Sequence, residues 1–134
     1  RSHSGSYKDS KNDCLFCVVR PNELLSENES CYASKDAHPV TPQHTLIIPK
    51  RHVVDYFDLT ELEIVGIHQM LIAMRSRIKN DDLTVKGFNI GVNAGKTAGQ
   101  SIPHVHIHLI PRRQGDVENP QGGVRGVIPD KQKY

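Results

Sequence analysis

Three histidines alternate with apolar residues in the stretch HVHIHLI, which spans residues 104–110. Side chains at every second position of a β-strand point to the same face of the sheet. The alternation therefore predicts a strand whose one face carries three imidazoles, while the apolar side chains between them pack into a core. The imidazoles belong to His104, His106 and His108, and neighbouring ones would be spaced about 6.5–7 Å apart along the backbone.

The histidine face has three possible interpretations: an ordinary solvated face, a zinc hydrolase site, and a site for phosphoryl or nucleotidyl transfer. The first two are the weaker ones. Any half-buried strand shows a solvated polar face, but chance seldom places three histidines in strict alternation. A zinc hydrolase would use two or three of them as ligands, and it also needs a further ligand, an open position and usually a carboxylate base. No Asp or Glu lies between Asp82 and Asp116, so the nearby sequence offers no such base. The zinc hydrolase stays open but is not favoured.

The third interpretation is phosphoryl or nucleotidyl transfer. A neutral imidazole is nucleophilic near pH 7 and forms a reactive phosphoramidate, so one difficult displacement becomes two easier ones. A second, protonated histidine can neutralise charge on the phosphate and assist the leaving group. The segment GKTAGQS (95–101) directly before the histidines offers two glycines, a lysine, a hydroxyl and an amide to a phosphate. A phosphate loop that leads into a histidine strand favours this third interpretation.

Composition sets further limits. The chain has 134 residues, of which 37% are hydrophobic and 24% charged, as is typical of one globular domain with a core. The net charge of +2 is too small for a nucleic-acid scaffold, so a bound anion must be held by local geometry. No apolar run is long enough to cross a membrane and no secretory signal is evident, so a cytoplasmic protein is expected. An odd number of cysteines, three, also argues against a disulfide framework.

The remaining pattern predicts an α+β fold. Residues 31–34, 45–48 and 87–93 are typical of short strands, and no element is predicted in the polar segment 20–30. A long helix is expected over 58–80, because Thr60 and Glu63 form a capping box and apolar residues recur at helical spacing at Ile67, Leu71, Met74 and Ile78. Residues 114–134 are expected to be loop-like. Residues 1–13 are expected to be a disordered tail or a cloning remnant, and 14–134 a single domain.

HVHIHLI resembles the signature of the histidine triad (HIT) superfamily, His-φ-His-φ-His-φ-φ with φ apolar, at all seven positions. The blocks HTLIIPKRH, GVNAGKTAGQS and HVHIHLIPRRQGD also resemble family blocks in order and spacing, so the resemblance covers residues 14–116. The PRRQGD and GGVRGVIP segments are most similar to the bacterial and archaeal Fhit-like diadenosine polyphosphate hydrolases, and the absence of Trp argues against a Hint-type phosphoramidase. The resemblance implies a mostly antiparallel five-stranded sheet, one long and one short helix, and a homodimer.

The resemblance also implies roles for individual residues. His106 would be the nucleophile at the α-phosphorus, with its other ring nitrogen oriented by a backbone carbonyl, that of His104. Gln100 would contact a phosphate or the scissile oxygen, and Asp36 the ribose hydroxyls. The implied catalytic set is His106, His108, His104, His44 and Gln100. The implied nucleotide-binding set is Asp36, Asn93, Gln100, Ser101, His108 and Phe16, with Val19 beside Phe16 in an apolar slot for the base.

The function implied is hydrolysis or transfer at the α-phosphate of dinucleoside polyphosphates or related nucleotides, through a covalent nucleotidyl-histidine intermediate. Two alternatives remain, a Hint-like nucleoside phosphoramidase and a non-catalytic nucleotide-binding protein of the same fold. The leaving group, and whether water or inorganic phosphate accepts the nucleotide, stay open. The expected partners are a nucleotide and a second copy of the chain, and neither nucleic acid nor a membrane is expected.

Cys14 and Cys17 have the spacing of half a zinc site, a weak signal by itself that two ordinary cysteines near the edge of a core would also give. A thioredoxin-like motif would need a βαβ context, whereas a polar segment follows here. The resemblance implies a structural zinc ion bound by Cys14, Cys17, His52 and His104, and no cofactor for catalysis. The first histidine of the triad would then differ in function from the other two.

Overall fold

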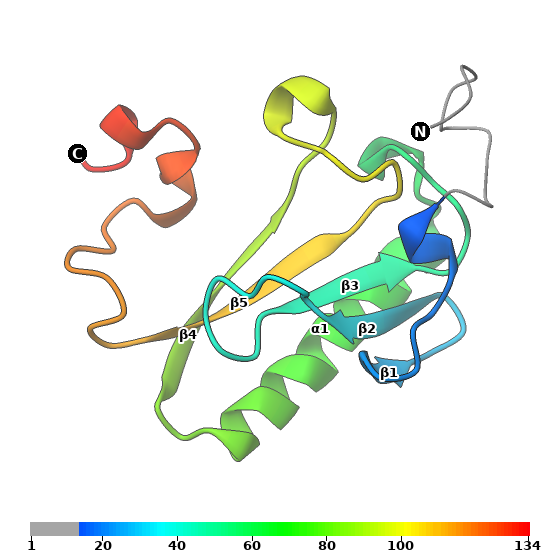
Figure 1. The fold of residues 1–134 in the computed structure, drawn as a ribbon, viewed down its shortest axis with the longest axis horizontal. Coiled ribbons are helices and arrows are strands. Elements are labelled where there is room, and N and C mark those ends of the chain that lie inside the picture. The colour runs from blue at the N-terminus through cyan, green and yellow to red at the C-terminus, as the bar shows by residue number, and fades with distance from the viewer. Residues whose placement is uncertain (1–13) are drawn as a thin grey trace.

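The computed structural model describes residues 14–134, so the tail expected at residues 1–13 lies outside the described residues. Five strands form one sheet in the order β1-β2-β3-β5-β4, and every neighbouring pair is antiparallel. The strands are Leu24–Glu27 (β1), Cys31–Lys35 (β2), Thr45–Pro49 (β3), Val85–Val92 (β4) and Ile107–Arg113 (β5). One α-helix, Glu61–Asp81 (α1), packs along the sheet (Figure 1). The predicted α+β class with a five-stranded antiparallel sheet is confirmed.

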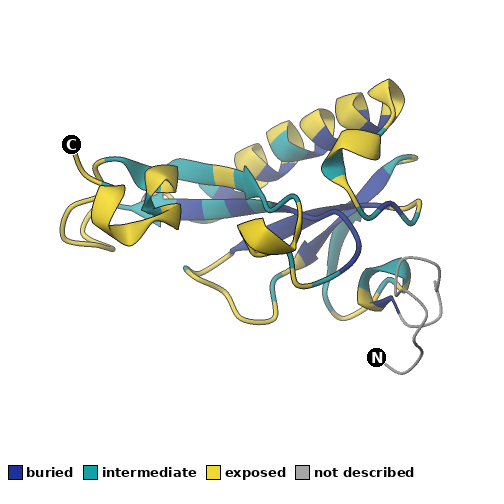
Figure 2. Ribbon diagram, turned by 90° about the horizontal axis from the view of Figure 1, so that it is seen from above, coloured by how far each residue is buried: buried dark blue, intermediate teal, exposed yellow. Residues whose placement is uncertain are grey.

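The other helical segments within residues 14–134 are 3-10 turns of three to five residues. One of them, Leu15–Cys17, lies at the start of the described chain on the side of the sheet opposite α1 (Figure 2). Two more, Gly123–Val127 and Pro129–Lys131, occur in the segment 114–134, which projects beyond the end of the sheet (Figure 1). No helix in the described part of the chain is long and apolar enough to cross a membrane.

Strand β1 has no counterpart among the predicted elements. It lies in the polar segment 20–30, pairs only with β2 at the edge of the sheet, and has an irregular register between Leu24 and Ser26. An edge strand contacts one neighbouring strand and is partly exposed, so it needs little of the hydrophobic periodicity that marks an inner strand. The strand conformation of β1 therefore depends more on its pairing with β2 than on the sequence of its own four residues.

Strand β5 begins three residues later than the histidine alternation suggests, because His104 and His106 precede its first residue, Ile107. The two-residue period nevertheless continues through the segment before the strand. Val105, Ile107 and Leu109 are all buried in the main core, as expected. His104 and His106 are buried as well, with exposed fractions of 0% and 7%. The interpretation of the histidine face as an ordinary solvated face is therefore wrong.

The main core lies between α1 and one face of the sheet. The helix contributes Ile67, Met70, Met74 and Ile78, which pack with Ala33, Ile47, Val85 and the apolar residues of the histidine segment. Leu71, expected on this face, is only partly buried, and Met70 takes the inward position. Each fully buried side chain of this size stabilises the fold by roughly 1.5–3 kcal/mol.

A second, smaller core covers the opposite face of the sheet. Tyr32, Leu46 and Ile48 alternate with residues of the main core along β2 and β3, and the segment containing Phe16 and Val19 packs on them. The hydroxyl of Tyr32 donates a hydrogen bond to the carbonyl of Phe16 over 2.6 Å. The N-terminal segment is thereby held on the same face of the sheet to which the histidines point.

The start of α1 is the capping box that the sequence predicts. The hydroxyl of Thr60 accepts from the Glu63 amide over 3.1 Å, and the Glu63 carboxylate accepts from the Thr60 amide over 2.9 Å. Arg51 donates to both oxygens of the same carboxylate, over 2.9 and 2.8 Å. The hydrogen bonds from Arg51 are the largest of the effects that lower the pKa of Glu63, and they outweigh its partial burial.

We expect Glu63→Gln to lower the free energy of unfolding at pH 7 by about 1 kcal/mol, since it weakens a helix cap and a solvent-screened ion pair. A lowered carboxylate pKa gives stabilisation that is present above the unfolded pKa and lost as the pH falls through the folded pKa. The difference between the two proteins should therefore shrink below about pH 4. Chemical denaturation across pH 3–8 measures it, with Glu61→Gln, an exposed first-turn glutamate, as the control. A difference that does not change with pH would contradict this assignment.

Candidate active site

A cavity of about 480 Å³ opens on the sheet face opposite α1. Its wall brings together six of the residues predicted to form the site, namely Phe16, Asp36, Asn93, Ser101, His106 and His108. Val18 lines the cavity, whereas Val19 packs against the second core. Tyr32 and Leu46 also line it, and they were not predicted. They occupy alternate positions of β2 and β3, so correct pairing of these strands would have placed them on the histidine face.

His106 is oriented by the backbone of its own segment. Its Nδ1 lies 2.9 Å from the carbonyl oxygen of His104, as the family resemblance implied. A carbonyl oxygen only accepts hydrogen bonds, so Nδ1 carries a proton, and in the neutral ring the lone pair is on Nε2. The ring of Phe16 packs edge-on against His106, with centroids 5.1 Å apart. The arrangement gives a buried imidazole whose second nitrogen, Nε2, is suited to nucleophilic attack when it carries no proton.

His108 pairs with His44, the residue that immediately precedes β3. The Nε2 atom of His44 lies 2.9 Å from Nδ1 of His108 and 3.5 Å from a carboxylate oxygen of Asp36. Burial, assisted by the neighbouring imidazoles of His106 and His44, lowers the pKa of His108 to about 4. Burial also lowers the pKa of His44, although Asp36 opposes the shift. The second histidine is thus neutral near pH 7 in the free protein, not protonated as the sequence interpretation supposed.

Gln100 lies in the predicted phosphate loop but uses its side chain within the protein. The amide nitrogen donates to the carbonyls of Val54 and Ile102 over 2.8 and 3.1 Å, and the amide oxygen accepts from the Gly95 amide over 2.9 Å. Gly95 and Gly99 have φ values of 99° and 100°, which favour glycine. Gln100 is not among the residues that line the cavity. Its contact with a phosphate stays a prediction.

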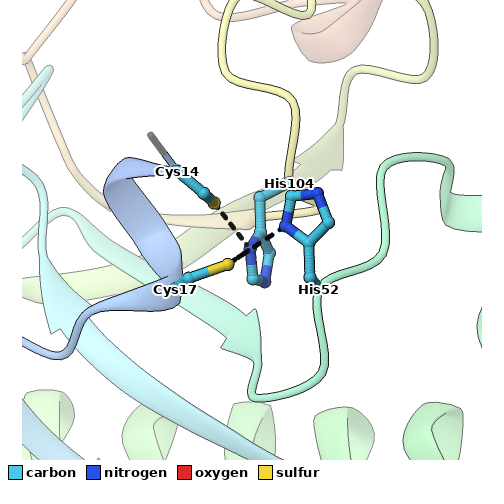
Figure 3. Close-up of side chains that lie close together, drawn as sticks. All are labelled: Cys14, Cys17, His52 and His104. Atoms are coloured by element: carbon cyan, nitrogen blue, oxygen red, sulfur yellow. Dashed lines mark hydrogen bonds between the residues drawn. The ribbon is translucent and has the colours of Figure 1, made fainter. Parts of the chain in front are cut away.

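The second predicted site is a cluster of two cysteines and two histidines (Figure 3). The four side chains of Cys14, Cys17, His52 and His104 place one ligand atom each within 4.8 Å of all the others. Sγ of Cys14 lies 3.2 Å from Nδ1 of His104, and Sγ of Cys17 lies 3.0 Å from Nδ1 of His52 and 3.4 Å from that of His104. Tetrahedral zinc at its usual bond lengths would separate a bound sulfur from a bound nitrogen by about 3.5 Å. The four residues fit such an ion.

The protonation of His104 supports the same conclusion. Its Nε2 lies 2.7 Å from the carbonyl oxygen of Pro49, so Nε2 carries the proton and Nδ1, which faces the two cysteines, does not. Histidines that bind metals generally donate their other ring N–H to a carbonyl or carboxylate in this way. Burial lowers the pKa of His104 to about 4, which keeps the ring neutral as a ligand must be.

Comparisons with known proteins point to the family that the sequence resembles. The family model described as HIT domain matches residues 18–115. A Dictyostelium discoideum protein named bis(5′-adenosyl)-triphosphatase is 37% identical over 103 residues, which cover 76% of this chain and 68% of that protein. The crystal structure of a zinc-bound histidine triad family protein from Mycobacterium smegmatis is 34% identical, covers 80% of both chains and has a TM-score of 0.66. A Bacillus anthracis HIT family protein is also 34% identical, with a TM-score of 0.70 and coverage of 81% and 82%.

We expect Gln100→Ala to lower the free energy of unfolding by about 1–3 kcal/mol, because two carbonyls and one amide lose their partner. Gln100→Glu should cost at least as much, since a carboxylate cannot donate to the carbonyls of Val54 and Ile102. Thermal unfolding measures both, and Thr97→Ala, an exposed position of the same loop, is the matched control. A variant with unchanged stability and a raised KM for a nucleotide would show instead that Gln100 acts on the substrate.

Proposed function

This chain belongs to the HIT domain family, and from this we propose that it is a nucleotide hydrolase or nucleotidyltransferase that cleaves at the α-phosphate of dinucleoside polyphosphates or related nucleotides. The observation that carries the proposal is the state of His106, whose Nδ1–H is held by a backbone carbonyl while its Nε2 is left bare at the cavity. The name of the Dictyostelium relative, bis(5′-adenosyl)-triphosphatase, supports the same substrate class.

The reaction has two displacements at phosphorus. In the first, Nε2 of His106 forms a bond to the α-phosphorus, the bond from phosphorus to the bridging oxygen breaks, and the leaving phosphate or nucleotide takes the bonding electrons. In the second, an oxygen of water or inorganic phosphate forms a new bond to phosphorus, the bond between phosphorus and Nε2 breaks, and its electrons return to the imidazole, while an attacking water releases its proton to the solvent. The retained Nδ1–H bond to the His104 carbonyl keeps the ring aligned in both steps and stabilises the charge that it gains.

The cavity wall provides groups for each part of a nucleotide. Ser101 and Asn93 can donate to phosphate oxygens, and His108 lies beside His106, with ring centroids 5.3 Å apart. Asp36 lines the cavity and can accept hydrogen bonds from the ribose hydroxyls, with Oδ1 also accepting from the His38 amide and Oδ2 lying 3.5 Å from Nε2 of His44. Phe16 supplies an apolar surface for a base. Loss of the Asp36 carboxylate would weaken binding of the ribose, whereas loss of the Ser101 hydroxyl or the Asn93 amide would weaken binding of the phosphate.

Two other activities are compatible with the same cavity. A nucleoside phosphoramidase would use the same nucleophile and differ only in a nitrogen leaving group. A non-catalytic nucleotide-binding protein would bind the same ligands without turnover. The bare Nε2 of His106 favours a catalyst over a binding module, and a panel of dinucleoside polyphosphates, phosphoramidates and nucleotide sugars would separate the alternatives.

We further propose that Cys14, Cys17, His52 and His104 hold a structural zinc ion. Bound there, the ion would supply a closed four-ligand cross-link and no step of the reaction. The cross-link joins the N-terminal turn, which carries Phe16, to the segment that enters the catalytic histidines. His104 would serve both sites, through its ring at the metal and its carbonyl at His106.

The homodimer belongs to the same proposal. Strand β4 forms one edge of the sheet, and its residue Ile90 is 52% exposed. Leu62, Val65 and Ile72 are exposed on the outer surface of α1. A second copy of the chain is the partner expected to cover these apolar groups, since exposed apolar side chains on an edge strand and a helix can form an interaction surface.

We expect His106→Asn to reduce kcat for diadenosine triphosphate by at least about 1000-fold, because removal of a covalent nucleophile commonly costs this much or more. The binding of AMP should change little. Turnover measured by chromatography and AMP binding measured by calorimetry test the two statements, and His68→Gln on the exposed surface of α1 serves as the control. Near wild-type turnover in His106→Asn would refute the assignment of the nucleophile.

We expect about one zinc ion per chain by elemental analysis of protein purified without chelators. The double variant Cys14→Ser, Cys17→Ser should lose the metal and melt at a lower temperature, because a structural zinc site contributes directly to folding. Cys31→Ala, which changes the buried third cysteine outside the cluster, should keep the metal. A metal-free wild-type protein, or a double variant that still binds one zinc ion, would count against the site.

A further inference from the structure

A continuous set of hydrogen bonds connects the backbone of the β2–β3 loop to the cavity through two imidazoles. The backbone amide of Val40 donates to Nδ1 of His44 over 3.0 Å. Nε2 of His44 lies 2.9 Å from Nδ1 of His108, and His108 in turn lines the cavity. The hydroxyl of Thr41 donates to the carbonyl of Pro111 over 2.6 Å, which fastens this loop to β5. These hydrogen bonds hold the β2–β3 loop and the rings of His44 and His108 in fixed positions relative to one another.

The direction of the first bond determines the direction of the second. A backbone amide can only donate, so Nδ1 of His44 is unprotonated and the neutral ring carries its proton on Nε2. That proton faces Nδ1 of His108, which must then be the acceptor. The neutral ring of His108 is left with its proton on Nε2. We propose that His44 is a positioning residue that fixes His108 as a neutral N–H donor to the substrate phosphate, and that the Val40 amide sets this arrangement.

The same geometry argues against a second metal site. Asp36, His44 and His108 bring three ligand atoms within 4.8 Å of one another. A metal at Nε2 of His44 would have to displace the proton there, while the Val40 amide already occupies Nδ1. The ring would become an imidazolate or would have to give up its backbone hydrogen bond. A proton donor is therefore the better description of this cluster than a metal ligand.

Several groups face the rings of His44 and His108, and most of their effects favour the neutral form of both rings. Nδ1 of each ring already accepts a hydrogen bond, so adding a proton to either ring would break one of these bonds. Burial opposes a positive charge on both rings, and His106 acts on His108 in the same direction. Among residues 14–134, Asp36, 3.5 Å from His44, is the one acidic group that favours a cation. Asp36 also gives the proton on His44 Nε2 a second acceptor.

The consequence for the reaction rests on the function proposed above. A neutral imidazole can donate Nε2–H to a phosphate oxygen or to the bridging oxygen as charge develops there, and it needs no prior protonation to do so. His44 does not contact the substrate in this scheme. It acts by keeping the lone pair of His108 Nδ1 occupied, so that the proton of His108 remains on the nitrogen that faces the cavity.

Two substitutions of the same size at His44 separate this role from simple packing. In His44→Gln, the side-chain amide group can still donate to His108 Nδ1 and to Asp36, which both surround the original Nε2 position. In His44→Glu, a carboxylate there can only accept, which would draw the proton of His108 to Nδ1 or make the ring a cation. His68→Gln, at an exposed position on α1, is the control.

Nitrogen-15 NMR of the histidine rings and steady-state kinetics with diadenosine triphosphate form the test. For the wild type, His108 should show a bare Nδ1 and a protonated Nε2 throughout pH 5.5–8. His44→Gln should preserve this pattern and keep kcat within about tenfold, whereas His44→Glu should change the pattern and lower kcat by about 100-fold or more, with a smaller effect on KM.

A cationic His108 in the wild type at pH 7, or a bare Nε2, would overturn the proposal. Equal losses of kcat in the two His44 variants, with the His108 pattern unchanged in both, would also overturn it. A wild-type protein that cleaves none of the nucleotides would refute the proposed function instead, and the NMR spectra would still decide which nitrogen of His108 carries the proton.

Discussion

Each imidazole of the triad makes a hydrogen bond at one ring nitrogen, and this bond decides what the other nitrogen can do. His104 donates from Nε2 to the Pro49 carbonyl and presents a bare Nδ1 to the cysteines. His106 donates from Nδ1 to the His104 carbonyl and presents a bare Nε2 to the cavity. His108 accepts at Nδ1 from His44 and keeps its proton on Nε2. In the proposed scheme, one residue type thus supplies a zinc ligand, a nucleophile and a hydrogen-bond donor.

The rest of the fold shields these rings from solvent, since His104 and His106 are buried and His108 is partly buried. Water would compete for each ring nitrogen and would stabilise the cations, so the pattern depends on exclusion of solvent. The sheet and α1 close one side, and the N-terminal turn closes the other. Phe16 packs against His106, while the Tyr32 hydroxyl holds the Phe16 carbonyl from the sheet. The cysteine pair fastens the same turn to His104.

Much of the fold follows from local sequence. The capping box at Thr60 marks the start of the helix, and strands β2 and β3 appear where apolar residues are bounded by turns. The misassigned parts lack a local signal. Strand β1 is defined by its pairing with β2. The start of β5 depends on where β3 and β4 begin to pair with it, at Ile107.

The two-residue period of HVHIHLI by itself determined that three histidines share one face and that the valine, isoleucine and leucine between them enter the core. The family resemblance added which residues gather around them, and six of these do line one cavity. Only the tertiary structure decided which nitrogen of His104 and which nitrogen of His108 carries the proton. For His104, the deciding group is the carbonyl of Pro49, which is 55 residues away in the sequence. For His108, it is the backbone amide of Val40, which acts through His44. No local pattern encodes a hydrogen bond between segments that meet only when the sheet has formed.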